Sequence, residues 1–153
     1  MLRKLMNFFK PDESGTTVNS AKPLHLAAAG LLVEAATADA DYGASQRDVI
    51  VSLCRDRFGL TQTDAEELVA EAEEEAKDTS ELYGFTRTVR EQMPPEDRVQ
   101  IIEMLWEVVY ADGVLHDYEA GLLRRISGLI YVEDQESGAA RKRVMAKLGL
   151  TGR

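Results

Sequence analysis

The sequence predicts an all-α fold, a bundle of about seven helices in two related halves. Three observations indicate this. Apolar residues recur with helical spacing from Leu24 onward, and no segment alternates with a period of two. Only four prolines and eleven glycines occur in 153 residues, which leaves long stretches free of helix breakers. In addition, two stretches 73 positions apart resemble each other.

The repeated stretches are residues 34–39 (EAATAD) and 107–112 (EVVYAD). The likeness extends beyond them at the same offset, since Leu32 matches Leu105. Repeated apolar residues are expected of two copies of one packing unit, whereas repeated carboxylates add nothing to a core. We therefore expect the first and second helices to be related to the fifth and sixth as a pseudo-two-fold pair, with an acidic corner in each copy.

The first helix is expected over about residues 24–38, where alanine and leucine predominate. Its many small side chains permit close approach of a neighbouring helix. The second helix is expected to begin at Ser45, whose side chain can cap free N–H groups while Asp48 completes a capping box. Gly59 is expected to end it, in the usual C-terminal role of glycine.

The third helix is expected to begin at Thr63, with Glu66 as its capping-box partner. Residues 64–77 hold seven carboxylates, which indicates a solvated acidic helix face. The fourth helix is expected over about residues 80–92, where apolar side chains again follow helical spacing.

Pro94 and Pro95 break the chain and open the fifth helix, since proline is tolerated in a first helical turn. This helix is apolar nearly all round, which indicates a central position in the bundle. The sixth helix is expected from Asp117, a good N-cap, to about Ile130. The seventh carries apolar residues over 139–148.

A single helical domain is expected over residues 24–150. Residues 1–10 are basic and amphipathic, without the apolar core and cleavage site of a secretory signal. Residues 11–23 are polar and rich in turn formers, which is typical of a flexible linker. For residues 1–10, weak contact with an anionic membrane surface and docking onto the bundle or a second subunit are all open alternatives.

The bulk properties exclude several classes of function. A net charge of −9 and a pI near 4.8 argue against nucleic-acid binding, because a polyanion would be repelled. The single cysteine, Cys54, excludes an internal disulfide, fits a reducing cytoplasm, and lies on an apolar helix face, which predicts a buried, inert thiol. We expect a cytoplasmic protein, at most peripheral to the inner membrane face, with a protein partner; the oligomeric state is not indicated.

The two acidic corners are the candidate functional feature. Two ionised carboxylates about 4 Å apart repel by roughly 4 kcal/mol at an effective dielectric constant of 20. A divalent cation converts this repulsion into binding, and oxygen ligands in a flexible loop favour calcium, although the spacing is not that of an EF-hand. The members are Glu34, Asp39 and Asp41 in the first corner, and Glu107, Asp112, Asp117 and Glu119 in the second.

These acids also fit two roles that need no metal. Asp39, Asp112 and Asp117 can cap helices and end turns, or the corners can form an acidic patch that faces a partner. Glu34 and Glu107 lie too far before the helix ends to act as caps, and both have apolar neighbours. A partly buried carboxylate needs a cation, an arginine or several hydrogen bonds. The arginines that the sequence suggests as partners are Arg47, Arg124 and Arg125.

Two short motifs, Ala38-Asp39 and Ala111-Asp112-Gly113, end the first and fifth expected helices. Seven positions after each aspartate stand Gln46 and Glu119, respectively. This pattern resembles the TerB-like tellurite-resistance family. The resemblance covers about residues 24–148. It implies an all-helical domain with pseudo-two-fold halves and acidic residues proposed to bind metal. Similar domains occur in tellurite and stress-response operons, and fused to J-domains in membrane-anchored cochaperones.

Carried over by position, Asp112 and Glu119 match the family's second acidic motif and Asp39 matches the first. Gln46 and Ala40 depart from the family's pattern in the first motif, where Asp41 can supply a carboxylate instead. The resemblance indicates a type of domain, and a domain type does not by itself define an activity.

No catalytic motif accompanies these acids. The sequence contains no glycine-rich phosphate loop, no nucleophile motif and no zinc-ligand spacing around His25 and His116, its only histidines. The sequence therefore predicts a non-enzymatic adaptor, related to stress or tellurite resistance, with an acidic site for a divalent cation. The alternative is a plain protein–protein interaction module without metal, and a metal-dependent hydrolase comes third.

Overall fold

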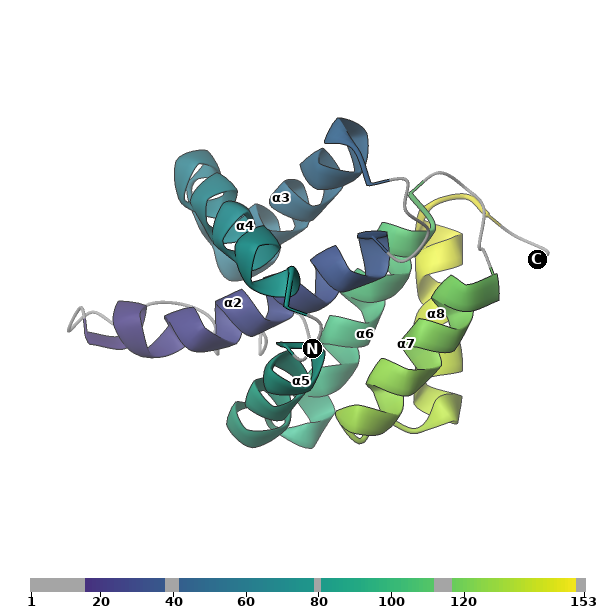
Figure 1. The fold of residues 1–153 in the computed structure, drawn as a ribbon. Helices are drawn as coiled ribbons and strands as arrows, with labels where there is room; N and C mark the ends of the chain where they lie inside the picture. Colours follow the sequence, from purple (N-terminus) through teal and green to yellow (C-terminus); the bar gives the residue numbers. More distant parts are fainter. Residues whose placement is uncertain (1–15, 38–41, 79–80, 112–116, 151–153) are drawn as a thin grey trace.

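The computed structural model describes residues 16–37, 42–78, 81–111 and 117–150. Over these ranges the chain forms seven α-helices and no strand, which confirms the predicted all-α class (Figure 1). The helices are α2 (Thr16–Thr37), α3 (Ala44–Phe58), α4 (Gln62–Ala76), α5 (Glu81–Gln92), α6 (Pro95–Val109), α7 (Asp117–Leu129) and α8 (Asp134–Lys147). The N-terminal residues 1–10 lie outside the described ranges, so weak membrane contact and docking onto the bundle or a second subunit stay open alternatives.

Helix α2 begins at Thr16, earlier than the expected start at residue 24, and takes in the second half of the stretch predicted as a linker. Pro23 consequently lies inside the helix. The polar residues before it resemble a linker in composition, but extending an existing helix is far easier than nucleating one. The domain boundary itself stays a prediction.

The start of α3 differs slightly from the expected one. Gly43 is the N-cap, and its backbone N–H donates to the Gln46 side-chain oxygen at 3.3 Å. The capping role predicted for Ser45 and Asp48 is thus taken by Gly43 and Gln46. At the other end, Gly59 is the C-cap with φ of 67°, a conformation that glycine adopts without strain, as predicted.

The other helix ends follow local capping chemistry. Helix α4 is capped by Thr61, whose hydroxyl accepts a hydrogen bond from the Asp64 backbone N–H at 3.1 Å, rather than by Thr63. Helix α6 begins at Pro95 and α7 at Asp117, both as predicted. Nearly every residue of α6 is buried, which confirms its expected central position.

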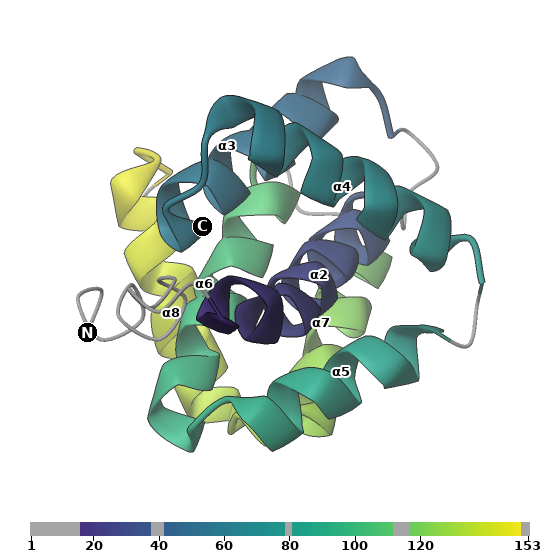
Figure 2. The same cartoon turned by 90° about the vertical axis from the view of Figure 1, so that its left-hand side faces the viewer.

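Helix α2 passes through the middle of the bundle. Figure 2 looks along it and shows α3 and α4 above, α5 below and α6 beside it. Helix α6 in turn contacts α8, α2 and α7. The members of each expected pair, α2 with α3 and α6 with α7, are in contact, while the pseudo-two-fold relation between the pairs stays a prediction.

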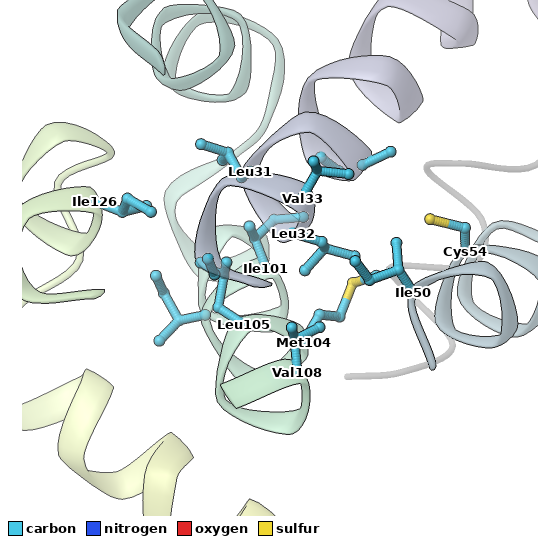
Figure 3. Packing of buried hydrophobic residues seen from close by; sticks show 14 of the residues in the cluster. Leu31, Leu32, Val33, Ile50, Cys54, Ile101, Met104, Leu105, Val108 and Ile126 are labelled. Atoms are coloured by element: carbon cyan, nitrogen blue, oxygen red, sulfur yellow. The ribbon is translucent and has the colours of Figure 1, made fainter. Parts of the chain in front are cut away.

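The core lies where α2 and α6 cross. Leu32 of α2 packs beside Met104 and Val108 of α6, with Ile50 of α3 closing the group (Figure 3). Each of these side chains is at most 3% exposed, and burying one contributes about 1.5–3 kcal/mol. The last turns of α2 and α6, which carry the repeated glutamates, are therefore held side by side by apolar packing. Of the described helices, none has the length and apolar character needed to span a bilayer.

Candidate functional site

The predicted ligands fall into three groups. Glu34 on α2, Glu107 on α6 and Glu119 on α7 have described side chains. Asp117 is the first residue of α7, as predicted, and its side chain lies outside the described part. The remaining predicted ligands, Asp39, Asp41 and Asp112, lie outside the described residues.

Glu34 sits near the end of α2 and is half-buried. It follows the core residue Leu32 by two positions, which turns it about 200° round the helix, away from the Leu32 contact. No described side chain forms a hydrogen bond or ion pair with its carboxylate. Burial raises the pKa of Glu34, because the charged form loses hydration there. Among the described residues, no cation offsets the cost of ionising this carboxylate.

Glu107, the corresponding residue on α6, has a different environment. It is only 6% exposed, yet two cations reach it: Lys147 of α8 bonds to Oε1, and Arg57 Nη2 of α3 lies 3.6 Å from Oε2. The buried Oε2 atom accepts no hydrogen bond in the described structure. Glu107 thus links three helices electrostatically, and its charge is already largely compensated.

The partners of Glu107 are not the arginines that the sequence suggested. Arg47 instead pairs with Glu73 of α4, with 3.0 Å between Arg47 Nε and Glu73 Oε2. Arg125 bonds to the Tyr83 hydroxyl. The sequence offered Arg47 as a partner, but the contact of α3 with α6 brings Arg57 to Glu107 instead.

A sequence signal for the Glu107 cluster exists. Glu103 and Glu107 are four residues apart on α6, and Arg143 and Lys147 are four apart on α8. Residues at this spacing share one face of a helix. The structure pairs them in register, with 2.7 Å between Arg143 Nε and Glu103 Oε2 and Lys147 bonded to Glu107. Matched acidic and basic spacings on two helices would have indicated the contact between α6 and α8.

Glu119 lies in the first turn of α7 and is 2% exposed. A carboxylate this deeply buried requires compensation by charge or hydrogen bonds. The sequence argument for partial burial named only Glu34 and Glu107, and the structure adds Glu119 to the buried acids.

Tyr42, the first described residue after the first corner, contacts α4. Its hydroxyl bonds to the Glu73 carboxylate, which also accepts from Arg47 Nε. Burial and the neighbouring carboxylate raise the pKa of Tyr42 above its ordinary value, because both disfavour a phenolate. Tyr42 is therefore anchored to α4, and Glu73 is committed to this contact.

Within the described ranges, no three side chains of His, Cys, Asp or Glu gather closely enough to hold a metal ion. A cation site at the corner therefore needs oxygen ligands from the residues that lie outside those ranges. Glu34 fits such a site because no cation in the described ranges compensates its charge. Glu107 fits less well, since a cation would compete with Lys147 and Arg57 for it.

The helices and their partly buried acids define a small all-helical domain with carboxylates near the ends of two central helices. The chain belongs to the family described as "Tellurite resistance protein TerB", whose model matches residues 25–142. The match takes in most of α2, all of α3 to α7 and much of α8. It confirms the resemblance to the TerB-like family that the Ala-Asp motifs at residues 38–39 and 111–112 indicated. No curated protein and no solved structure matched the chain.

Proposed function

We propose that this TerB-family domain is a non-enzymatic adaptor in tellurite resistance or a related stress response, and that its acidic corner binds a divalent cation, with calcium favoured. In this proposal the protein acts in the cytoplasm through a protein partner. The bound cation would order the corner and so change the surface that the partner meets.

The observation that carries the cation site is the state of Glu34. Its carboxylate is half-buried, has no counter-ion among the described residues and has a raised pKa. A divalent cation would remove the cost of ionising it there. Carboxylates of the family's motif, Asp39 and Asp112, would complete the oxygen ligands, and calcium accepts such mixed sets.

The second candidate function is a protein-interaction module without metal. Glu107 favours it, because Lys147 and Arg57 already compensate this carboxylate without any added ion. If all the repeated acids were balanced in this way, the corners would be structural. The exposed acids of α4, such as Glu67, would then supply the partner-facing charge.

Calorimetric titration with calcium, magnesium, manganese and zinc separates the two candidates. We expect saturable calcium binding by the wild-type chain, and its loss in the Asp39→Asn, Asp112→Asn double variant. Glu34→Gln should weaken binding at least about tenfold, since a charged ligand interaction is worth roughly 1.5–3 kcal/mol. Glu67→Gln, an exposed change on α4, serves as the matched control and should bind calcium like the wild type.

Thermal unfolding provides an independent readout. A ligand present at a hundred times its Kd stabilises the folded state by about 2.7 kcal/mol. Calcium should therefore raise the Tm of the wild type and of Glu67→Gln, but not that of the double variant. Absence of both heat and Tm shift with all four cations would exclude the cation site and favour the metal-free module.

The biological part of the proposal has a separate test. Deleting the gene in its own host should increase sensitivity to tellurite or to another stress, and the wild-type gene should restore growth. Restoration by the Asp39→Asn, Asp112→Asn gene would mean that the adaptor works without the cation site.

A further inference from the structure

A pocket apart from the acidic corners lies among α6, α7 and α8. It has a volume of about 210 Å³ and is lined by Trp106 of α6, Arg124 of α7 and Arg141 of α8, among others. None of its lining residues is one of the predicted cation ligands. Pockets for drug-sized ligands usually occupy about 300–1,000 Å³, so this one suits a small group.

Arg141 is held rigidly at the pocket wall. Its Nε donates to the Tyr110 hydroxyl at 2.7 Å, and its guanidinium carbon lies 5.6 Å from the centre of the Trp106 ring system and 5.9 Å from that of Tyr110. The terminal amino groups of Arg141 bond to no described residue. Because the Tyr110 hydroxyl and the two rings hold the guanidinium in place, its terminal amino groups, which have no partner in the described ranges, are preorganised for a planar or tetrahedral anion.

Arg124 adds a second guanidinium from a different helix. Its side chain is exposed and forms no ion pair or hydrogen bond with any described residue, in a chain with 27 acidic and 18 basic side chains. Asp134 also lines the pocket without an ion pair in the described structure, so the lining has two positive charges and one negative charge. The excess positive charge favours an anion.

Ser137 provides a further donor. Its Oγ accepts from the Trp106 indole N–H at 3.3 Å and from the Ser127 hydroxyl at 3.5 Å. A hydroxyl that accepts twice still has its own proton to donate. Ser137 lines the pocket and is 8% exposed, so that proton is available to a bound group rather than to bulk water.

We propose that this pocket binds an oxyanion, the carboxylate or phosphate group of a small molecule, between Arg124 and Arg141. The fork of guanidinium donors matches both kinds of oxyanion. Asp134 would accept a hydrogen bond from a hydroxyl or ammonium group on the same ligand. The site is independent of the proposed cation site, so either can fail without the other.

Trp106 is the only tryptophan in the chain, so its fluorescence reports on the pocket directly. The full chain would be titrated with inorganic phosphate, with succinate and, at matched ionic strength, with sodium chloride. We expect a saturable change with phosphate or succinate that chloride does not produce, and the stronger of the two identifies the anion class. Equal responses to all three salts, or no response, would overturn the proposal.

Variants connect the signal to the pocket. Arg124→Gln should weaken anion binding at least about tenfold, since the anion loses its charge-assisted hydrogen bonds to this guanidinium. Arg125→Gln is the matched control, because the neighbouring guanidinium lies 5.3 Å from the Tyr83 ring centre and does not line the pocket. Equal weakening in both variants, or none in Arg124→Gln, would show that the response is only general screening.

A variant that fills the pocket without changing its charge tests whether the anion binds inside it. Gly138 lines the pocket, and a Cβ added there meets no atom within 4 Å. Gly138→Leu should therefore fold, since leucine is also a better helix former than glycine. Its larger side chain should fill the pocket and abolish the phosphate or succinate response while the Tm stays at or above the wild-type value. Undiminished binding by this folded variant would place the anion elsewhere.

Discussion

Gly30 of α2 faces the ring of Phe85 of α5 so closely that no side chain fits between them. A Cβ added to Gly30 would lie 2.7 Å from Phe85 Cδ2 and closer still to Cε2 and Cζ. Both residues are buried, and the ring occupies the space that a side chain on α2 would need. Glycine inside a helix costs about 0.5–1 kcal/mol relative to alanine, and the packing of Phe85 offsets that cost.

Gly30→Ala is therefore expected to destabilise the protein by about 1–3 kcal/mol, the usual cost of overpacking a core, although alanine favours helices. Urea unfolding followed by circular dichroism measures this free energy. Gly138→Ala is the control, because its Cβ meets nothing within 4 Å, and it should gain about 0.5–1 kcal/mol. Equal stabilisation by the two changes would contradict the close contact of α2 with α5.

Arg57 is expected to matter because it faces the buried carboxylate of Glu107. Arg57→Met should cost about 3 kcal/mol of unfolding free energy, as removal of one partner of a buried ion pair usually does. Combining it with Glu107→Gln should recover part of that loss, since the uncompensated charge is then gone. Arg143→Met, which removes a half-exposed partner of Glu103, should cost less than about 1 kcal/mol. Additive effects of Arg57→Met and Glu107→Gln would argue against their coupling.

Glu34 should make stability depend on pH. Its pKa is raised above the ordinary 4.5, so the folded state holds the proton more tightly than the unfolded chain does. Ionisation therefore disfavours the folded state at neutral pH, and this penalty disappears as the pH falls below 4.5. Without added cations, Glu34→Gln should be modestly more stable than the wild type at pH 7 and not at pH 4. Urea unfolding at the two pH values, with Glu67→Gln for comparison, measures the difference in unfolding free energy between Glu34→Gln and the wild type.

Cys54 should be inert in the folded protein. It is fully buried, as the sequence predicted, and burial raises the pKa of its thiol to about 12, because a thiolate there would lose its hydration. At pH 8 a disulfide reagent is expected to modify it only at the rate of unfolding, and denatured protein should react at once. Rapid modification of the native chain would mean that the contact of α3 with the core opens locally.

Much of the helical framework could be read from local patterns. The start of α6 at Pro95 and the end of α3 at Gly59 follow from the backbone chemistry of those two residues alone. The start of α2 could not be read in this way, because helix extension through a polar stretch depends on what the helix already contains. Likewise, Thr61 and Thr63 are both suitable caps, and their side-chain chemistry does not distinguish them.

In the candidate site, too, some features could be predicted from the sequence and others depend on the packing of the helices. Sequence identified Glu34 and Glu107 as unusual acids, since their position before a helix end and their apolar neighbours are local properties. That one glutamate is compensated by Lys147 and Arg57 while the other lacks a described partner was decided by tertiary structure. The spacing of side chains along one helix determines which face of that helix they occupy. Which charges on different helices meet is determined by how the helices cross. For this reason the helical class and the acids came from the sequence, and the contact of Gly30 with Phe85, the partners of Glu107 and the arginine-lined pocket came from the packing.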